Sequence, residues 1–69
     1  MAVLNSIELE GVSAQSWHAA ALEALREASK TLRGIRRLDI LGTSAGVAHD
    51  DVAEYRTRVR LYFEVEPHR

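Results

Sequence analysis

The alternating segment from residue 53 to residue 65 limits most strongly how this chain can fold. Its odd positions are apolar or small and its even positions are charged or aromatic, in the order Ala-Glu-Tyr-Arg-Thr-Arg-Val-Arg-Leu-Tyr-Phe-Glu-Val. A period of two predicts a strand with one dry face and one wet face. At about 3.3 Å per residue such a strand reaches about 43 Å, whereas a compact domain of this size has a radius of gyration of about 11 Å. We therefore expect another subunit to cover part of the strand.

The length of the chain points the same way. With 69 residues it is predicted to form a single domain, 1–69, and such a domain buries only about 60% of the surface that its unfolded chain exposes. Domains this small need disulfide bonds, a bound metal ion, an exceptional core or oligomerisation to be stable. The sequence contains no Cys, which excludes disulfides and thiolate metal sites. Oligomerisation is therefore the expected source of additional stability.

Charge and hydropathy exclude several classes of protein. The formal net charge is -1, whereas a general nucleic-acid-binding protein shows a basic excess. The uninterrupted apolar stretches are too short to span a bilayer. The first residues lack the basic and apolar regions of a signal peptide. We therefore predict a cytoplasmic protein with neither nucleic acid nor membrane as a partner.

The first half of the chain predicts a strand followed by a helix. Residues 3–10 alternate in polarity and Gly11 closes the strand. Ser13 is the expected N-cap of a helix from Ala14 to Arg33, and Gly34 is the candidate C-cap. Apolar residues recur at helical spacing in this segment, which places Trp17 in the predicted core. The members of this stripe are Trp17, Ala21, Ala24, Ala28 and Leu32.

The second half predicts two further strands. One runs from Ile35 to Leu41 or on to Val47, and residues 48–51 form a turn. The last strand continues to residue 66 and is ended by Pro67. The order β-α-β-β indicates an α+β fold, in which a three-stranded antiparallel sheet is wrapped on one helix. The odd face of the last strand and the helix stripe form the expected core.

Several segments, taken in this order, resemble the dodecin family. No one segment is a sharp motif; order, spacing and length together carry the resemblance, which covers nearly the whole chain. The segments are Leu9-Glu10-Gly11-Val12-Ser13 before the Ala-rich helix, Thr31-Leu32-Arg33-Gly34-Ile35 after it, Val52-Ala53-Glu54-Tyr55, and Val59-Arg60-Leu61-Tyr62-Phe63-Glu64-Val65-Glu66.

The resemblance implies a hollow homododecamer that binds flavins, such as riboflavin or its nucleotide FMN, in pairs near two-fold axes. Dodecins act as flavin stores or scavengers and not as enzymes. In typical members a tryptophan of the second strand stacks on the flavin ring, and a glutamine early in the third strand binds the ring edge. Those positions fall on Arg37 and Arg56 in this sequence.

Both residue types of the family's flavin site are therefore replaced by arginine. Arg37 can stack through its planar guanidinium, but Arg56 lacks the acceptor that glutamine offers to the flavin imide. We expect weakened binding of FMN or riboflavin, and a site better suited to another small anionic ligand. The alternative is that Arg37 pairs with Asp39, Glu54 or another acid. The assembly is then a structural shell without flavin that binds another anion or ions.

The remaining polar residues predict no catalytic residue and no metal site. Ser, His and Asp are present, but no pattern places a nucleophile beside a base. The three His residues lie far apart in sequence, and none has a second ligand at metal spacing. The row Arg56, Arg58, Arg60 could contact RNA, but the neighbouring acidic residues favour a cross-strand ladder of ion pairs.

Overall fold

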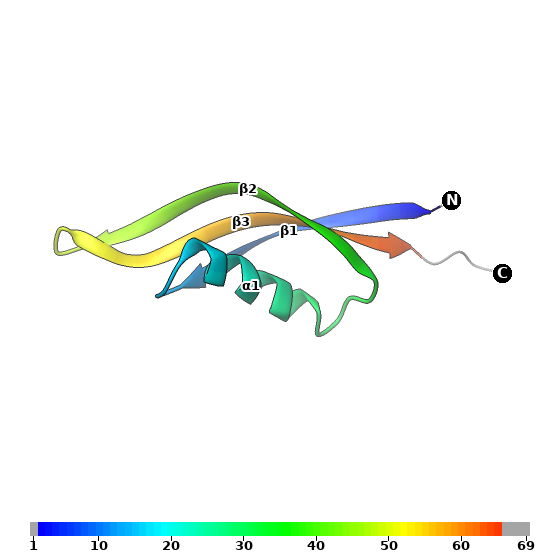
Figure 1. Ribbon diagram of the computed structural model, residues 1–69, viewed down its shortest axis with the longest axis horizontal. Helices are drawn as coiled ribbons and strands as arrows, with labels where there is room; N and C mark the ends of the chain where they lie inside the picture. The colour runs from blue at the N-terminus through cyan, green and yellow to red at the C-terminus, as the bar shows by residue number, and fades with distance from the viewer. Residues whose placement is uncertain (1, 66–69) are drawn as a thin grey trace.

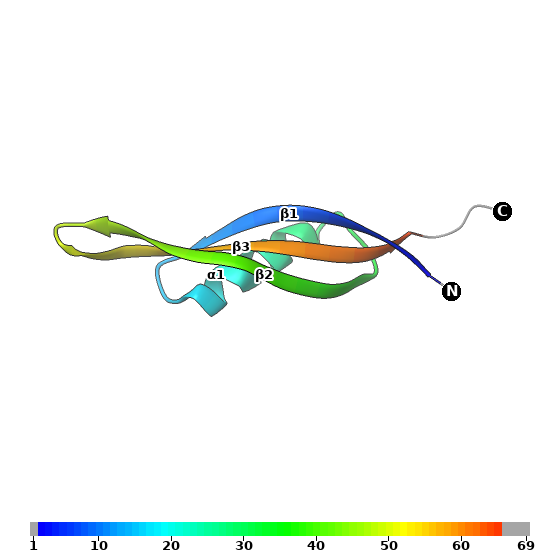
Figure 2. The same ribbon diagram turned by 90° about the horizontal axis from the view of Figure 1, so that it is seen from above.

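A computed structural model of the protein describes residues 2–65. It confirms the β-α-β-β order and the three-stranded antiparallel sheet with one helix (Figure 1). The elements are β1 (Val3–Ser13), α1 (Trp17–Ala28), β2 (Ile35–Ala48) and β3 (Asp51–Val65). The strand order is β1-β3-β2, so the alternating segment is the central strand (Figure 2). We call the side of the sheet that faces away from α1 the outer face.

The helix is shorter than predicted at both ends. Ser16, and not Ser13, is the N-cap, and its Oγ accepts a hydrogen bond of 2.9 Å from the N–H of Ala19. Ser13 is the last residue of β1, where it pairs with Tyr55 of β3. The helix ends at Ala28, five residues before the predicted end. Both serines suit a cap by residue type, but the pairing with β3 holds Ser13 in the sheet.

The two long strands form a hairpin with a tight turn. β2 continues to Ala48, one residue beyond Val47, the longer of the two predicted ends, and three register shifts interrupt its pairing with β3. His49 and Asp50 form the turn with positive φ angles of 54° and 62°, which is the backbone of a two-residue type I′ turn. Gly34 also has a positive φ, but it lies before β2 and does not cap the helix. The predicted strand end at Pro67 lies outside the described residues.

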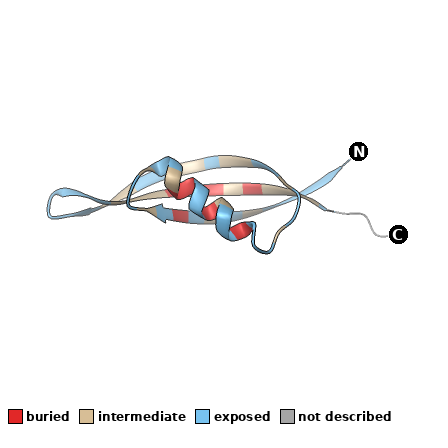
Figure 3. Cartoon of the chain, turned by 60° about the horizontal axis from the view of Figure 1, so that its bottom comes forward, coloured by how far each residue is buried: buried red, intermediate tan, exposed pale blue. Residues whose placement is uncertain are grey.

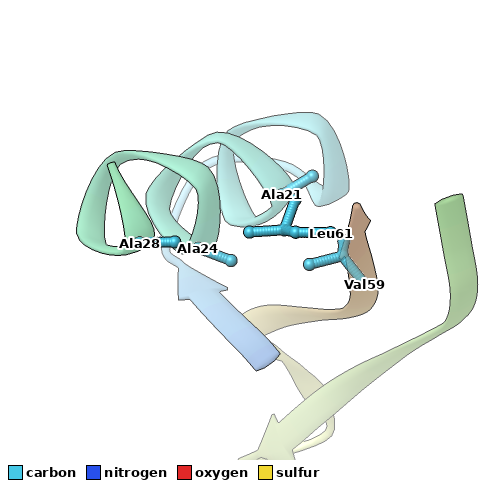
Figure 4. Close-up of a cluster of buried hydrophobic side chains, with 5 residues drawn as sticks. All are labelled: Ala21, Ala24, Ala28, Val59 and Leu61. Atoms are coloured by element: carbon cyan, nitrogen blue, oxygen red, sulfur yellow. The ribbon is translucent and has the colours of Figure 1, made fainter. Parts of the chain in front are cut away.

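Small helix residues bring α1 close to the central strand. Ala21, Ala24 and Ala28 pack on Val59 and Leu61, as Figure 4 shows. Burial is concentrated between α1 and the sheet, while the end of the β2–β3 hairpin is exposed (Figure 3). The odd face of β3 is therefore the core face at its centre, as the alternation predicts.

The prediction that Trp17 lies in the core is wrong. Its side chain is 44% exposed at the first residue of α1. The indole ring meets Tyr55 edge-on, with 5.0 Å between ring centroids. Its Nε1–H donates a hydrogen bond of 2.8 Å to the carbonyl oxygen of Ser44. The main-chain oxygen of Trp17 accepts a hydrogen bond from the hydroxyl of the buried Thr57. Trp17 therefore fastens the start of the helix to the hairpin.

Gly11 is expected to be intolerant of any side chain. A Cβ atom there would lie 1.7 Å from the carbonyl oxygen of Ala20, so Gly11→Ala must push the helix away from β1. We expect a loss of about 1–3 kcal/mol of unfolding free energy, as for other overpacked sites. Urea unfolding at fixed protein concentration measures this.

Gly42→Ala is the matched control for this prediction. Gly42 also lies in a strand, but a Cβ there would meet only an arginine side-chain nitrogen at 3.9 Å. Its unfolding free energy should change little, because a Cβ fits without strain. Equal losses for the two variants would contradict the close approach of α1 to β1.

Candidate functional site

The outer face of the sheet carries the arginines predicted from the sequence. Even residues of β3 point to this side, because the odd residues Val59 and Leu61 face the helix. Arginines and carboxylates pair across and along the strands. The ion pairs of β1, β2 and β3 are Arg60–Glu8 at 2.7 Å, Arg56–Glu10 at 3.0 Å, Arg37–Asp39 at 3.4 Å, Arg56–Glu54 and Arg36–Glu64.

Arg56 lies between two carboxylates. Its guanidinium donates hydrogen bonds to Glu10 of β1 and to Glu54 of its own strand. These two bonds, that to Glu10 first, raise the pKa of Arg56 above its ordinary value. Arg56 is therefore a charged group with acidic partners on both sides, and an incoming anion would have to compete with them.

Arg37 is stacked on an aromatic ring. It is the cross-strand partner of Tyr62, and its guanidinium carbon lies 3.8 Å from the centroid of that ring. This is a cation–π contact. Its Nε is 3.4 Å from a carboxylate oxygen of Asp39. The ring of Tyr62 therefore already contacts this guanidinium, and a planar ligand that stacks on Arg37 would have to share it with Tyr62.

One chain does not bring the two arginines together. Arg37 lies opposite Tyr62, six residues along β3 from Arg56, which corresponds to about 20 Å. A site that contains both must therefore take them from different copies. Sequence spacing alone could not reveal this separation, because it depends on the register between β2 and β3.

The predicted ladder of ion pairs is confirmed for two of its three arginines. Arg60 bonds Glu8 directly across the strands, and this hydrogen bond lowers the pKa of Glu8 below its ordinary value. Arg58 stands directly opposite Glu10, but that carboxylate bonds Arg56. Within residues 2–65, Arg58 has no ion pair. These pairs are solvent-exposed, and such pairs contribute little to stability.

The sequence pattern does not predict the apolar groove that lies between α1 and β2. It has a volume of about 500 Å³. Its apolar lining continues the core at the side of β2. One feature of the sequence could have indicated this groove: apolar residues lie on both sides of Gly34, beyond the end of the helix. The apolar residues of the groove are Leu25, Leu32, Ile35 and Leu38, and its polar residues include Ser29, Arg33, Arg36 and Arg37.

Among residues 2–65, no three His, Asp or Glu side chains gather closely enough to hold a metal ion. The described helix is neither long nor apolar enough to cross a membrane.

Several solved structures share this fold. A protein from Thermus thermophilus superposes with a TM-score of 0.93 at 28% identity, covering 99% of this chain and 100% of its own. The dodecin of Streptomyces coelicolor superposes with a TM-score of 0.92 at 22% identity, covering 97% of this chain and 96% of its own.

A third similar structure has been described as a calcium dodecin, the calcium-chelating immunodominant antigen of Mycobacterium tuberculosis. It superposes with a TM-score of 0.81 at 27% identity, and covers 97% of this chain and 96% of its own. No curated protein sequence matches the chain. The family model for dodecins matches residues 3–66. With nearly the whole length of the sequence covered by that model, the chain belongs to the dodecin family.

Proposed function

We propose that this chain, as a single domain of residues 1–69, forms a closed homododecamer in the cytoplasm and binds and stores a small molecule there. Membership of the dodecin family supports a small-molecule-binding role. The proposed role is binding and not catalysis, since the sequence offers no nucleophile placed beside a base.

The observation that carries the assembly is the exposure of Ile40. This residue is the cross-strand partner of Val59 on the helix side of the sheet, yet Ile40 is 58% exposed while Val59 is fully buried. The reason is that α1 packs on β1 and β3. The chain measures 57 × 20 × 13 Å along its principal axes, too extended for one helix to cover. Val47 and Val52 of the hairpin are exposed as well, and several exposed apolar residues on one part of a chain favour an interface between subunits.

The proposed ligand is a flavin, riboflavin or FMN, held more weakly than in typical dodecins, or another small anion. Arg37 and Arg56 are the proposed binding residues, contributed by different copies. The guanidinium carbon of Arg37 lies 3.8 Å from the centroid of the Tyr62 ring, and a planar guanidinium can also stack on the ring system of a ligand. Arg56 would contribute positive charge, which suits a phosphate more than a neutral flavin ring.

A second candidate is a dodecameric shell that holds no flavin and binds another anion or ions. The contacts of Arg56 favour it, because Glu10 and Glu54 already neutralise this guanidinium. The calcium-chelating relative from Mycobacterium tuberculosis is a precedent for an ion as the ligand of a dodecin.

Native mass spectrometry of protein purified from its own host tests the proposal. The expected main species has a mass of about 92 kDa, twelve times the 7.7 kDa of one chain, because the apolar faces left open in one copy need a partner. A retained small molecule would appear as additional mass and can be identified after denaturation. Light scattering in dilute neutral buffer is the control for assembly in solution. A folded monomer or dimer as the main species would refute the dodecamer.

A further inference from the structure

The groove between α1 and β2 is an open end of the hydrophobic core. Leu25, Leu32, Ile35 and Leu38 pack against the buried core residues, yet each remains only partly buried. The rim is basic. Arg36 bonds Glu64, whereas Arg33 has no ion pair among residues 2–65. The groove therefore presents apolar surface beside an uncompensated positive charge.

The end of the β2–β3 hairpin has the complementary character. It extends beyond both α1 and β1, as Figure 1 shows. Val47 and Val52 are cross-strand partners, and they are 70% and 45% exposed. The segment between them carries Asp50 in the turn and Asp51 at the start of β3, and neither has an ion pair within residues 2–65. We call residues 47–52 the hairpin tip.

We propose that the hairpin tip of one copy docks in the α1–β2 groove of a neighbouring copy, with Val47 and Val52 against the apolar lining and Asp50 beside Arg33. This inference rests on the proposed assembly and assigns one of its contacts. Burial of apolar surface supplies the main driving force, and the charges favour one register over others.

The geometry makes this contact head-to-tail. Ile35 of the groove and Val47 of the tip are twelve residues apart along β2, a distance of about 40 Å. A chain cannot dock its own tip in its own groove. Each copy offers a tip at one end and a groove at the other, and such heterologous contacts form a ring when the rotation between successive copies closes. A ring is the unit that a closed shell with rotational symmetry requires.

The absence of Cys from the sequence permits a direct test in the full chain. A variant with Ser29→Cys in the groove and Val47→Cys in the tip is treated with a short bis-maleimide and separated under denaturing conditions. Because the two positions are too far apart within one chain, every cross-link between them joins two copies. Docking should raise the yield of covalent species larger than a dimer by more than about tenfold over the control, since docked sites have an effective concentration in the millimolar range.

The matched control replaces Ser29→Cys by Leu22→Cys, which is 39% exposed on α1 and does not line the groove. Each single-cysteine variant is a further control, since one cysteine per chain can yield dimers only. A cross-linking yield in the control equal to that of the test variant would overturn the proposal. The proposal would also be overturned if native mass spectrometry showed an oligomer but the cross-link between positions 29 and 47 were not favoured over the control. In that case the proposed assembly would stand. A monomeric mass would refute both.

A charge exchange probes the same contact independently. In the variant with cysteines at positions 29 and 47, Asp50→Arg should reduce the cross-linking yield severalfold, because it places like charge beside Arg33. Adding Arg33→Asp should restore the yield. If Asp50→Arg leaves the yield unchanged, or Arg33→Asp does not restore it, the proposed register is wrong. If the cysteine at position 29 prevents folding, Arg33→Cys with Val47→Cys serves the same cross-linking test.

Discussion

Leu61→Ala is expected to lower the free energy of unfolding by about 2–5 kcal/mol. Leu61 is fully buried at the centre of β3, where it packs against the alanines of α1. The helix cannot close the resulting cavity easily, since its main chain already touches Gly11 of β1. Thermal or urea unfolding followed by circular dichroism, at equal protein concentration, measures the loss.

Lys30→Ala is the control for this prediction. Lys30 is exposed, and its side chain forms an ion pair with the exposed Glu27, so the change should stay below about 0.5 kcal/mol. Equal losses for the two variants would show that the odd face of β3 is not the core face. Phe63, predicted from its odd position to be buried, is only half-buried near the end of β3, and Leu61 is therefore the sharper test.

The native protein is expected to bind riboflavin about two to three orders of magnitude more weakly than a typical dodecin, and Arg37→Trp with Arg56→Gln should recover much of that affinity. Loss of ring stacking forfeits about 1 kcal/mol beyond the area buried, and an unpaired flavin imide adds about 1–3 kcal/mol. Quenching of flavin fluorescence on titration with protein measures the affinity of the native protein and of the double variant. FMN should lose less than riboflavin if the arginines reach its phosphate.

The controls for flavin binding use the same face of the sheet. Neither Arg37→Trp nor Arg56→Gln alone should raise the affinity as far as the pair, because stacking and imide pairing are separate contributions. Arg58→Gln is the matched control: it makes the same chemical change two residues along β3, and it should not raise the affinity. Tight quenching of riboflavin by the native protein would contradict the assignment of Arg37 and Arg56.

The sequence alone determined the order of elements and the core face of the central strand. Strand periodicity is a local property, and Thr57, Val59 and Leu61 are buried as their odd positions predict. The same local pattern could not decide where the helix begins. Ser13 and Ser16 are equivalent cap residues, and only the pairing of Ser13 with β3 assigns the cap to Ser16.

The tertiary structure alone decided the surroundings of the candidate residues. Register between β2 and β3 places Arg37 on Tyr62, about 20 Å from Arg56. Glu10 bonds Arg56 diagonally and not Arg58 opposite it, because long side chains choose among several partners within reach. The exposure of Trp17 and the open groove at β2 follow from the position of α1 over β1 and β3. Each of these depends on contacts between residues distant in sequence, which a periodic pattern along one chain does not contain.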